Sequence, residues 1–380
     1  MLEGIEEIRS IDNHCHMYGI KTENPLERFT LTGNPANVKN TMAYYHAISE
    51  LAKLFSCRPE LDEILKARKY KMTNFKQYVS FLFENAGIGT LIIEPTVYPK
   101  VNMDEFRDVA PGVNVHFTIR TDEAIYDDLL NKSSTFDELV EGHASALDDA
   151  YKTGVVAFKC VIGYYTGLHI KRVDESEAEE SFKTFKKEPD KKKYMVYMPF
   201  FGTWQYKGPK RLRDFLFWKT IEKCIETNLP MQIHTADSDI TMKNMSIANP
   251  VLLHHVLTDD RAQKVNIVLL HAGYPFVAQS SFLTNFPNVY LDTSYIDLYT
   301  TLGLTNRLVE ILEIAPFTKI LYGSDAFGSP EMHWLGTKLT KKALREIFTK
   351  AVQDGILGES QALEIAEMML SGNAKKIYPI

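Results

Sequence analysis

The feature that most constrains the fold of this 380-residue chain is a repeated alternation of short apolar stretches with longer helical ones. Such alternation is typical of β-α units that build a parallel sheet. Eight of the apolar stretches have the length of strands, and they cover residues 11–16, 89–96, 113–120, 155–162, 231–234, 265–271, 289–293 and 320–325. Eight strands with helical connections are the number that closes a (β/α)8 barrel, so the sequence predicts an α/β fold of the TIM-barrel class.

One connection is longer than the others. Residues 25–85 are rich in Tyr, Phe and Leu and are predicted to be mostly helical. A simple crossover between parallel strands needs only a dozen or so residues, so we predict a helical insertion after strand 1 that covers the strand ends. No tandem repeat or low-complexity linker indicates a second domain, which predicts a single domain over residues 1–380. Residues 171–195 are acidic first and then basic, which predicts a solvated helix whose charges suit its dipole.

Composition excludes several classes of function. The chain is 45% hydrophobic and 24% charged, as an ordinary globular protein is, and its net charge of −6 gives no reason to expect nucleic-acid or membrane binding. The first residues are acidic, unlike a secretory signal, and the four cysteines are scattered. We therefore expect a cytoplasmic protein with reduced cysteines that acts on a small molecule, with a homo-oligomer favoured only by its general frequency.

The first predicted strand ends in Ile-Asp-Asn-His-Cys-His, residues 11–16. Side chains alternate between the two faces of a strand, so His14 and His16 are predicted to point the same way and Cys15 the other. Two neighbouring imidazoles can bind one divalent metal ion. The pair alone is weak evidence, and its weight depends on the later strands.

Four more titratable side chains lie at or near the carboxyl ends of predicted strands: Lys159, His234, His271 and Asp325. In a (β/α)8 barrel these ends meet at one mouth, where catalytic groups lie. Each residue alone has a simpler interpretation: a hydrogen-bonded histidine, a core lysine, or, for Asp325, the N-cap of a following helix. Six such groups on five strands together predict a metal centre.

These residues, in this order, resemble the amidohydrolase superfamily. The local sequence is more similar to its amidohydrolase-2 branch of metal-dependent hydrolases, including the amidohydrolase-like domain fused to glutamine-synthetase-type proteins. The matching stretches are 158–168, 233–235, 249–250, 270–276, 288–292, 323–326 and 372–378. The resemblance covers the chain apart from residues 25–85 and 171–195. One departure is Tyr165, where relatives often carry an arginine, so recognition of a charged substrate is not carried over.

Carried over to the matching positions, the resemblance implies that His14, His16 and Asp325 hold one metal ion. It implies that His234 and His271 hold a second. Zinc is the first expectation from the imidazole-rich set, with manganese or iron as alternatives. In a one-metal site, His271 would instead stabilise a developing oxyanion.

The chemical state expected for the Lys159 side chain depends on whether one or two metal ions are bound. A lysine ammonium beside two divalent ions would add repulsion in a site of low dielectric constant, whereas a carbamate would bridge them. Either Lys159 is carbamylated, or only one metal is bound and Lys159 points at the substrate. A Schiff-base lysine would leave the histidines unexplained.

The predicted activity is hydrolysis of a C–N or C–O bond (amide, ester or lactone) in a small molecule by metal-activated water, with Asp325 moving the proton. Candidate substrate contacts are Arg120, Tyr164 and Tyr165. A metal-dependent decarboxylase or isomerase is the alternative, because the same fold carries different reactions. A non-catalytic domain with a vestigial site is a third hypothesis, and the complete ligand set argues against it.

Overall fold

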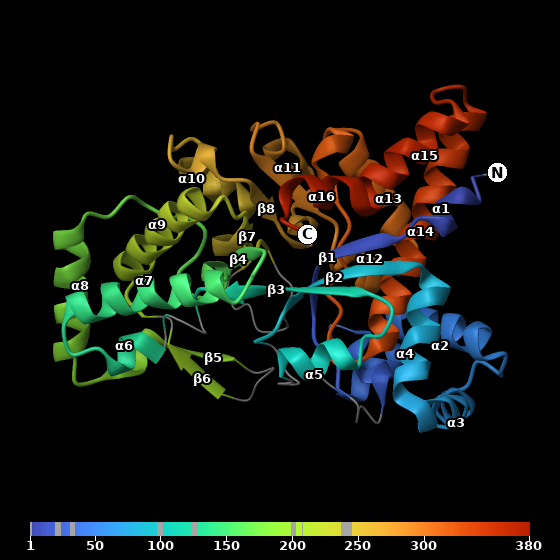
Figure 1. Ribbon diagram of the computed structural model, residues 1–380, viewed down its shortest axis with the longest axis horizontal. Coiled ribbons are helices and arrows are strands. Elements are labelled where there is room, and N and C mark those ends of the chain that lie inside the picture. The colour runs from blue at the N-terminus through green and yellow to red at the C-terminus, as the bar shows by residue number, and fades with distance from the viewer. Residues whose placement is uncertain are drawn as a thin grey trace. The chain divides into compact units, whose positions relative to one another are not determined.

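The computed structural model describes residues 2–19, 24–30, 35–96, 102–122, 126, 128–198, 203–206, 208–236 and 245–380. Eight strands form one sheet in the order β1-β2-β3-β4-β7-β8-β9-β10 (Figure 1). Every described pairing in this sheet is parallel. Sequential order, parallel pairing and intervening helices confirm the predicted (β/α)8 fold class.

The strands lie where the sequence predicts them but are mostly shorter. Their bounds are β1 (Ser10–His16), β2 (Ile88–Glu94), β3 (Asn114–Arg120), β4 (Ala157–Cys160), β7 (Met231–Ile233), β8 (Ile267–Leu269), β9 (Val289–Asp292) and β10 (Ile320–Leu321). The polar residues predicted as strand ends, such as His234, His271 and Asp325, come just after the last paired residue. Their side chains therefore belong to the loops that follow the strands.

By its internal contacts the chain divides into two compact units. The first unit comprises Met1–His116 and Asp292–Lys376, and the second comprises Phe117–Leu291 and Ile377–Ile380. The expectation of one domain over residues 1–380 stays a prediction. No helix in the described part of the chain has the length and apolar character that crossing a membrane requires.

In the first unit, α14 is the central helix. The helices of this unit are α1 (Gly4–Glu7), α2 (Met42–Phe55), α3 (Leu61–Lys71), α4 (Phe75–Ala86), α5 (Met103–Asp108), α12 (Ile296–Tyr299), α13 (Leu304–Leu312), α14 (Pro330–Gln353) and α15 (Glu359–Glu367); α16 (Asn373–Ile377) runs on to the boundary of the unit. Helix α14 packs against α4, α12 and α13 (Figure 1). Helices α2, α3 and α4 confirm the predicted helical insertion between the first two strands, as far as residues 25–85 are described.

A buried lysine joins three segments of the first unit. Lys341 of α14 has no exposed surface, and its Nζ donates to the carbonyl oxygens of Ile8 at 2.6 Å and Ala86 at 2.7 Å. A third bond reaches the carbonyl of Glu6 at 3.2 Å. Helix α4 ends at Ala86, so the bond to Ala86 satisfies a carbonyl oxygen that the helix cannot pair internally.

Replacing Lys341 with methionine should lower the free energy of unfolding by about 3 kcal/mol, because each buried carbonyl left without a donor costs about 1–3 kcal/mol. Urea unfolding measures the loss. The matched control is Lys338→Met on the same helix, which removes a partly exposed ion pair with Glu6. Such pairs contribute about 1 kcal/mol or less. Equal losses in the two variants would contradict this role of Lys341.

The second unit has its own apolar core. Its helices are α6 (Asp128–Lys132), α7 (Phe136–Lys152), α8 (Glu175–Lys187), α9 (Lys210–Thr227), α10 (His254–Leu257) and α11 (Val277–Leu283). Thr135 and Glu138 form a capping box at the start of helix α7. Helices α7, α8 and α9 pack together around a core that includes Phe136, Phe182 and Phe215.

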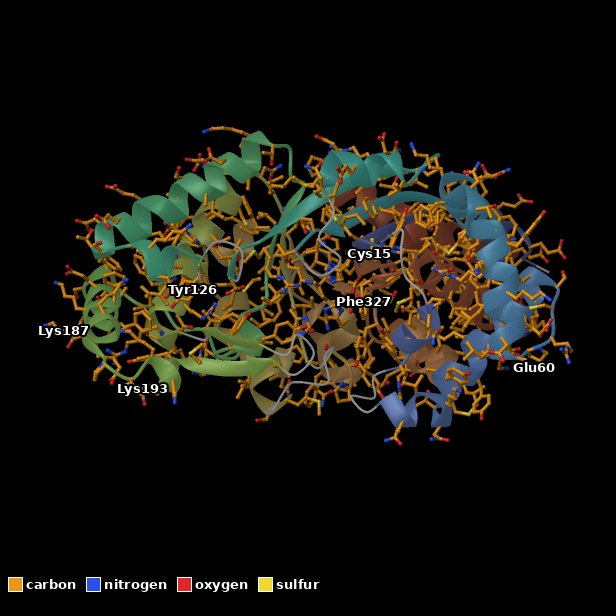
Figure 2. The ribbon with its side chains drawn as sticks, turned by 90° about the horizontal axis from the view of Figure 1, so that it is seen from below. Cys15, Glu60, Tyr126, Lys187, Lys193 and Phe327 are labelled. Carbon is orange, nitrogen blue, oxygen red and sulfur yellow. The ribbon has the colours of Figure 1, made fainter. Side chains whose placement is uncertain are left out.

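The charged stretch confirms one prediction and corrects another. Helix α8 has acidic residues in its first turn and lysines in its last, as predicted, and Lys187 and Lys193 project outward (Figure 2). However, one face of α8 is buried, including Phe182 and Phe185, so the helix is amphipathic rather than fully solvated. An antiparallel hairpin of β5 (Met195–Met198) and β6 (Thr203–Tyr206) follows, which the sequence did not predict.

One buried histidine of α7 makes stability depend on pH. Burial lowers the pKa of His143 to about 4. The unfolded chain, with an ordinary histidine pKa of about 6.5, binds more protons than the folded protein between these values, so stability falls as the pH drops from 6.5 towards 4. The expected slope is about 1.4 kcal/mol per pH unit within that window. His143→Gln should remove this contribution from unfolding free energies measured at several pH values. An unchanged slope would contradict it.

Candidate metal centre

The first unit brings together three of the residues predicted as metal ligands. His14 Nε2 lies 3.3 Å from Asp325 Oδ1, and His16 Nε2 lies 3.2 Å from the same oxygen. The two imidazole rings meet edge to face with centroids 5.1 Å apart. All three residues are buried, with exposed fractions of 0%, 5% and 9% for His14, His16 and Asp325. Strand alternation explains the pair of histidines, and the loop after β10 supplies the aspartate.

These distances fit a zinc ion. Nitrogen and oxygen ligands about 2.0–2.1 Å from a tetrahedral zinc ion lie about 3.3 Å from one another. The three ligand atoms lie within 4.8 Å of one another, so one ion can contact all of them. Three protein ligands leave a fourth position, which catalytic zinc sites use for water or substrate. The donor set, two imidazoles and one carboxylate, also suits zinc, manganese or iron.

Glu94, at the end of β2, orients one of the ligands. His16 Nδ1 lies 3.0 Å from the carbonyl oxygen of Glu94 and 3.3 Å from its carboxylate. The Glu94 carboxylate also accepts bonds from the amide and hydroxyl of Thr96, at 2.9 Å and 2.5 Å. A proton on Nδ1 that faces these acceptors leaves the Nε2 lone pair available to a metal. The sequence analysis assigned Glu94 no role, although its place at a strand end was a usable signal.

Asp325 is not a helix cap, which rules out its simpler interpretation. Helix α14 begins at Pro330 with Ser329 in the N-cap position. Asp325 has a φ of +54°, in the left-handed region that residues other than glycine seldom adopt. Such strained backbone is often found at functional sites.

The second unit brings together two more predicted ligands. The rings of His234 and His271 have centroids 4.5 Å apart, and the Tyr164 ring lies 4.1 Å from that of His234. Both histidines are buried, and each follows its strand. His271 has a φ of +68° and is followed by Ala272 at +52°, so the turn after β8 is also left-handed.

Lys159 and Arg120 occupy neighbouring strands of the second unit. Lys159 of β4 is paired with Arg120 of β3 and with Gln232 of β7, and only 2% of its surface is exposed. Arg120 is 4% exposed. The carbamate on Lys159 and the substrate contact of Arg120 stay predictions.

Tyr165 and Tyr164 differ in their surroundings. Tyr165 is buried, and the guanidinium group of Arg213 lies 4.2 Å from its ring centroid. Arg213 also pairs with Asp122 at 3.4 Å, and the other Asp122 oxygen accepts the amide of Val161 at 2.6 Å. Tyr165 thus packs on an arginine of its own chain, whereas Tyr164 is partly exposed beside His234. Their roles in substrate binding stay predictions.

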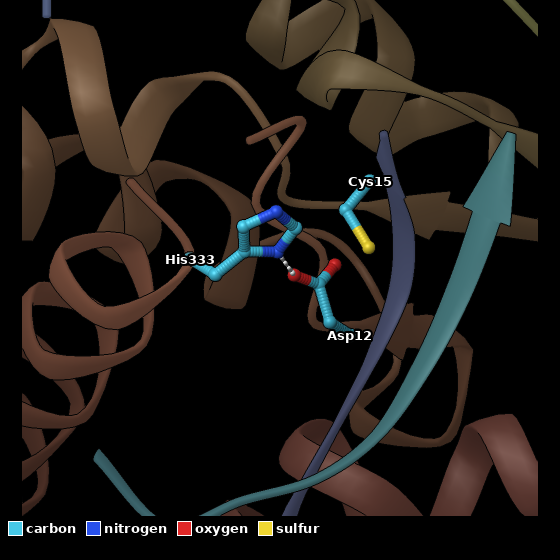
Figure 3. Close-up of side chains that lie close together, drawn as sticks. All are labelled: Asp12, Cys15 and His333. Atoms are coloured by element: carbon cyan, nitrogen blue, oxygen red, sulfur yellow. Dashed lines mark ion pairs between the residues drawn. The ribbon is translucent and has the colours of Figure 1, made fainter. Parts of the chain in front are cut away.

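A second group of possible ligands in the first unit comprises Asp12, Cys15 and His333 (Figure 3). Both carboxylate oxygens of Asp12 already accept hydrogen bonds from Ser324, and the Cys15 thiol donates to the Ile92 carbonyl at 3.6 Å. Burial raises the pKa of Asp12 to about 7 and lowers that of His333 to about 3. We therefore interpret this group as a buried hydrogen-bonded cluster.

A (β/α)8 fold in which two histidines of the first strand and an aspartate after the last strand face one position is the arrangement of the protein class that the sequence resembles. Comparison with known proteins finds similarities to the same class. Residues 204–380 match the amidohydrolase family. The chain is 27% identical to protein fluG of Emericella nidulans over 97% of its own length, and it spans 45% of that protein.

Solved structures agree with the fold. A protein from Lactobacillus casei assigned as a metal-dependent hydrolase matches 99% of this chain, and the match covers 96% of that structure with a TM-score of 0.83 and 25% identity. Uronate isomerase from Thermotoga maritima matches 99% of this chain and 96% of its own at a TM-score of 0.70, with 15% identity. The second likeness shows the fold alone, since its sequence identity is low.

Proposed function

We propose that this protein is a metal-dependent hydrolase that cleaves a C–N or C–O bond of a small molecule. The observation that carries the proposal is the convergence of His14 Nε2 and His16 Nε2 on Asp325 Oδ1, at 3.3 Å and 3.2 Å, with all three side chains buried. The match to the amidohydrolase family and the likeness to the Lactobacillus casei protein support it.

A divalent ion bound there would acidify a water molecule and polarise the substrate carbonyl. His14 and His16 would hold the ion through Nε2, with the His16 ring oriented by Glu94. Asp325 would bind through Oδ1, and its carboxylate would take the proton of the attacking water and return it to the leaving group. The side chain of Asp325 is 12% exposed, so part of it meets solvent.

We further propose that Lys159, His234 and His271 serve the same reaction. If a carbamate forms on Lys159, the two histidines bind a second ion; with one ion, His271 stabilises the oxyanion. A measured content of two zinc ions per chain would support the two-ion site with a carbamate on Lys159. A content of one ion per chain would support the one-ion site. The substrate is proposed to be a small molecule, and the expectations of cytoplasmic location and a homo-oligomer remain proposals.

The alternative is a one-metal isomerase or decarboxylase. It is favoured by the finding that, within the described residues, the first unit holds a complete three-ligand set for a single ion. Neither isomerisation nor decarboxylation adds water to the substrate, so analysis of the products separates both from hydrolysis.

The experiment begins with the metal content of protein purified without chelators. The metal is then removed, and the apoprotein and zinc-restored protein are assayed against amides, esters and lactones, and against uronates and aromatic carboxylates. We expect bound zinc, no activity in the apoprotein, and hydrolysis restored by zinc. Isomerisation or decarboxylation would instead support the alternative. Protein without bound metal that gains none from zinc would overturn the proposal.

A further inference from the structure

The backbone that carries Asp325 is held by β1, the strand that also carries the two histidines. The amide of Asp325 donates to the carbonyl oxygen of His14 at 2.9 Å, and the amide of His16 donates to that of Ala326 at 2.8 Å. These two hydrogen bonds fix the position of the loop along β1. Asp325 has a φ of +54°, a conformation that costs an L-amino acid roughly 1–2 kcal/mol, so further contacts that hold this turn contribute to its position.

A second contact with β1 fixes the residues on both sides of Asp325. The carboxylate of Asp12 accepts the amide of Ser324 at 2.9 Å on Oδ1 and the hydroxyl of Ser324 at 2.5 Å on Oδ2. Ser324 Oγ in turn accepts the amide of Ala326 at 3.0 Å. Asp12, Ser324 and Ala326 have no exposed surface, so water does not compete for these bonds.

An irregularity in β1 gives Asp12 this position. In a regular strand Asp12 would share a face with His14 and His16. The pairing with β2 advances three residues from Asp12 to Cys15 but only two on the partner, from Leu91 to Ile93. Such a bulge re-aims side chains. The possible ligand atom of Asp12 accordingly groups with those of Cys15 and His333 (Figure 3). Those of His14 and His16 group with that of Asp325.

We infer that Asp12 is a positioning residue, which holds Asp325 Oδ1 at the metal position through Ser324. The inference rests on the proposed metal centre. The ligand atom of Asp12 belongs to the neighbouring group with Cys15 and His333, and its hydrogen bonds to Ser324 carry its effect to the backbone of residues 324–326, beside a hydrogen bond from the backbone of His14. Without the Asp12 carboxylate, the turn relaxes and the third ligand moves away from the two histidines.

The test is the affinity of the full-length apoprotein for zinc, measured by competition with a chromophoric chelator. Loss of groups that orient metal ligands typically weakens metal binding about 10–100-fold, and we expect a loss of this size for Asp12→Ala. Asp12→Asn keeps an acceptor for the Ser324 amide and should lose less. The zinc affinity of Ser324→Ala should lie between that of Asp12→Ala and that of the wild type. Lys341→Met, which is destabilised in the same unit but remote from these bonds, should bind zinc as the wild type does.

Each outcome has one meaning. A folded Asp12→Ala protein with wild-type zinc affinity would overturn the inference and leave the proposed function standing. An equal loss in Lys341→Met would also overturn it, because general destabilisation would then explain the result. If Asp12→Ala does not fold, wild-type affinity in both Asp12→Asn and Ser324→Ala would overturn it. Wild-type protein that binds no zinc would overturn the proposed function and this inference together.

Discussion

Asp325→Asn should lower the rate of the proposed reaction by roughly 10³-fold, because proton transfer by a positioned carboxylate contributes about 10²–10⁴-fold. Asparagine is nearly the same size as aspartate and can still accept hydrogen bonds, but it cannot take a proton from water. The variant should also bind zinc more weakly, since a neutral amide replaces a charged ligand of the site formed with His14 and His16. Rates at saturating zinc separate the loss of proton transfer from the loss of metal.

The control for Asp325→Asn is Lys341→Met, which lowers stability without touching the ligand atoms. It should keep its rate at a temperature well below its unfolding transition. An Asp325→Asn protein that is loaded with zinc and retains the wild-type rate would contradict the role given to Asp325.

The largest expected effect on stability comes from a buried ion pair between the insertion and α14. The Glu331 carboxylate, with no exposed surface, accepts bonds from Arg68 Nε, from the Tyr78 hydroxyl at 2.7 Å and from the Ser329 hydroxyl at 2.6 Å. Arg68 belongs to α3 and Tyr78 to α4. The carboxylate thus ties the helical insertion to the start of α14, just after the loop that carries Asp325.

Glu331→Met should lower the free energy of unfolding by about 3–5 kcal/mol, the usual cost of removing one partner from a buried charge pair. In Glu331→Met, Arg68 would keep its buried charge without a counterion. In Arg68→Met, the Glu331 carboxylate would still accept hydrogen bonds from the Tyr78 and Ser329 hydroxyls, so this variant should be destabilised less. The double variant should be more stable than Glu331→Met, because it leaves no unpaired charge. Urea unfolding of the wild type, the two single variants and the double variant gives the coupling free energy between Arg68 and Glu331. Additive losses would contradict a buried pair.

The sequence predicted the fold class from local periodicity, and the same strand pattern singled out three residues whose possible ligand atoms lie together in the first unit. Alternation along β1 places His14 and His16 on one side and Cys15 with a different group, as predicted. The position of Asp325 follows from strand order in a parallel sheet.

Features that depend on distant partners were missed. The start of helix α14 at Pro330 was not among the predictions, and residues such as Glu331 and His333 in its first turn are buried by other elements of the unit. The orientation of His16 by Glu94 depends on the register of β1 with β2. The bulge that turns Asp12 towards Ser324 has no signal in the spacing of apolar residues.

The most direct test of the metal centre is a crystal structure of the zinc-loaded protein, with anomalous data collected on both sides of the zinc absorption edge. We expect an anomalous peak about 2.1 Å from His14 Nε2, His16 Nε2 and Asp325 Oδ1. A protein that folds with these three side chains in place but shows no zinc peak among them would contradict it.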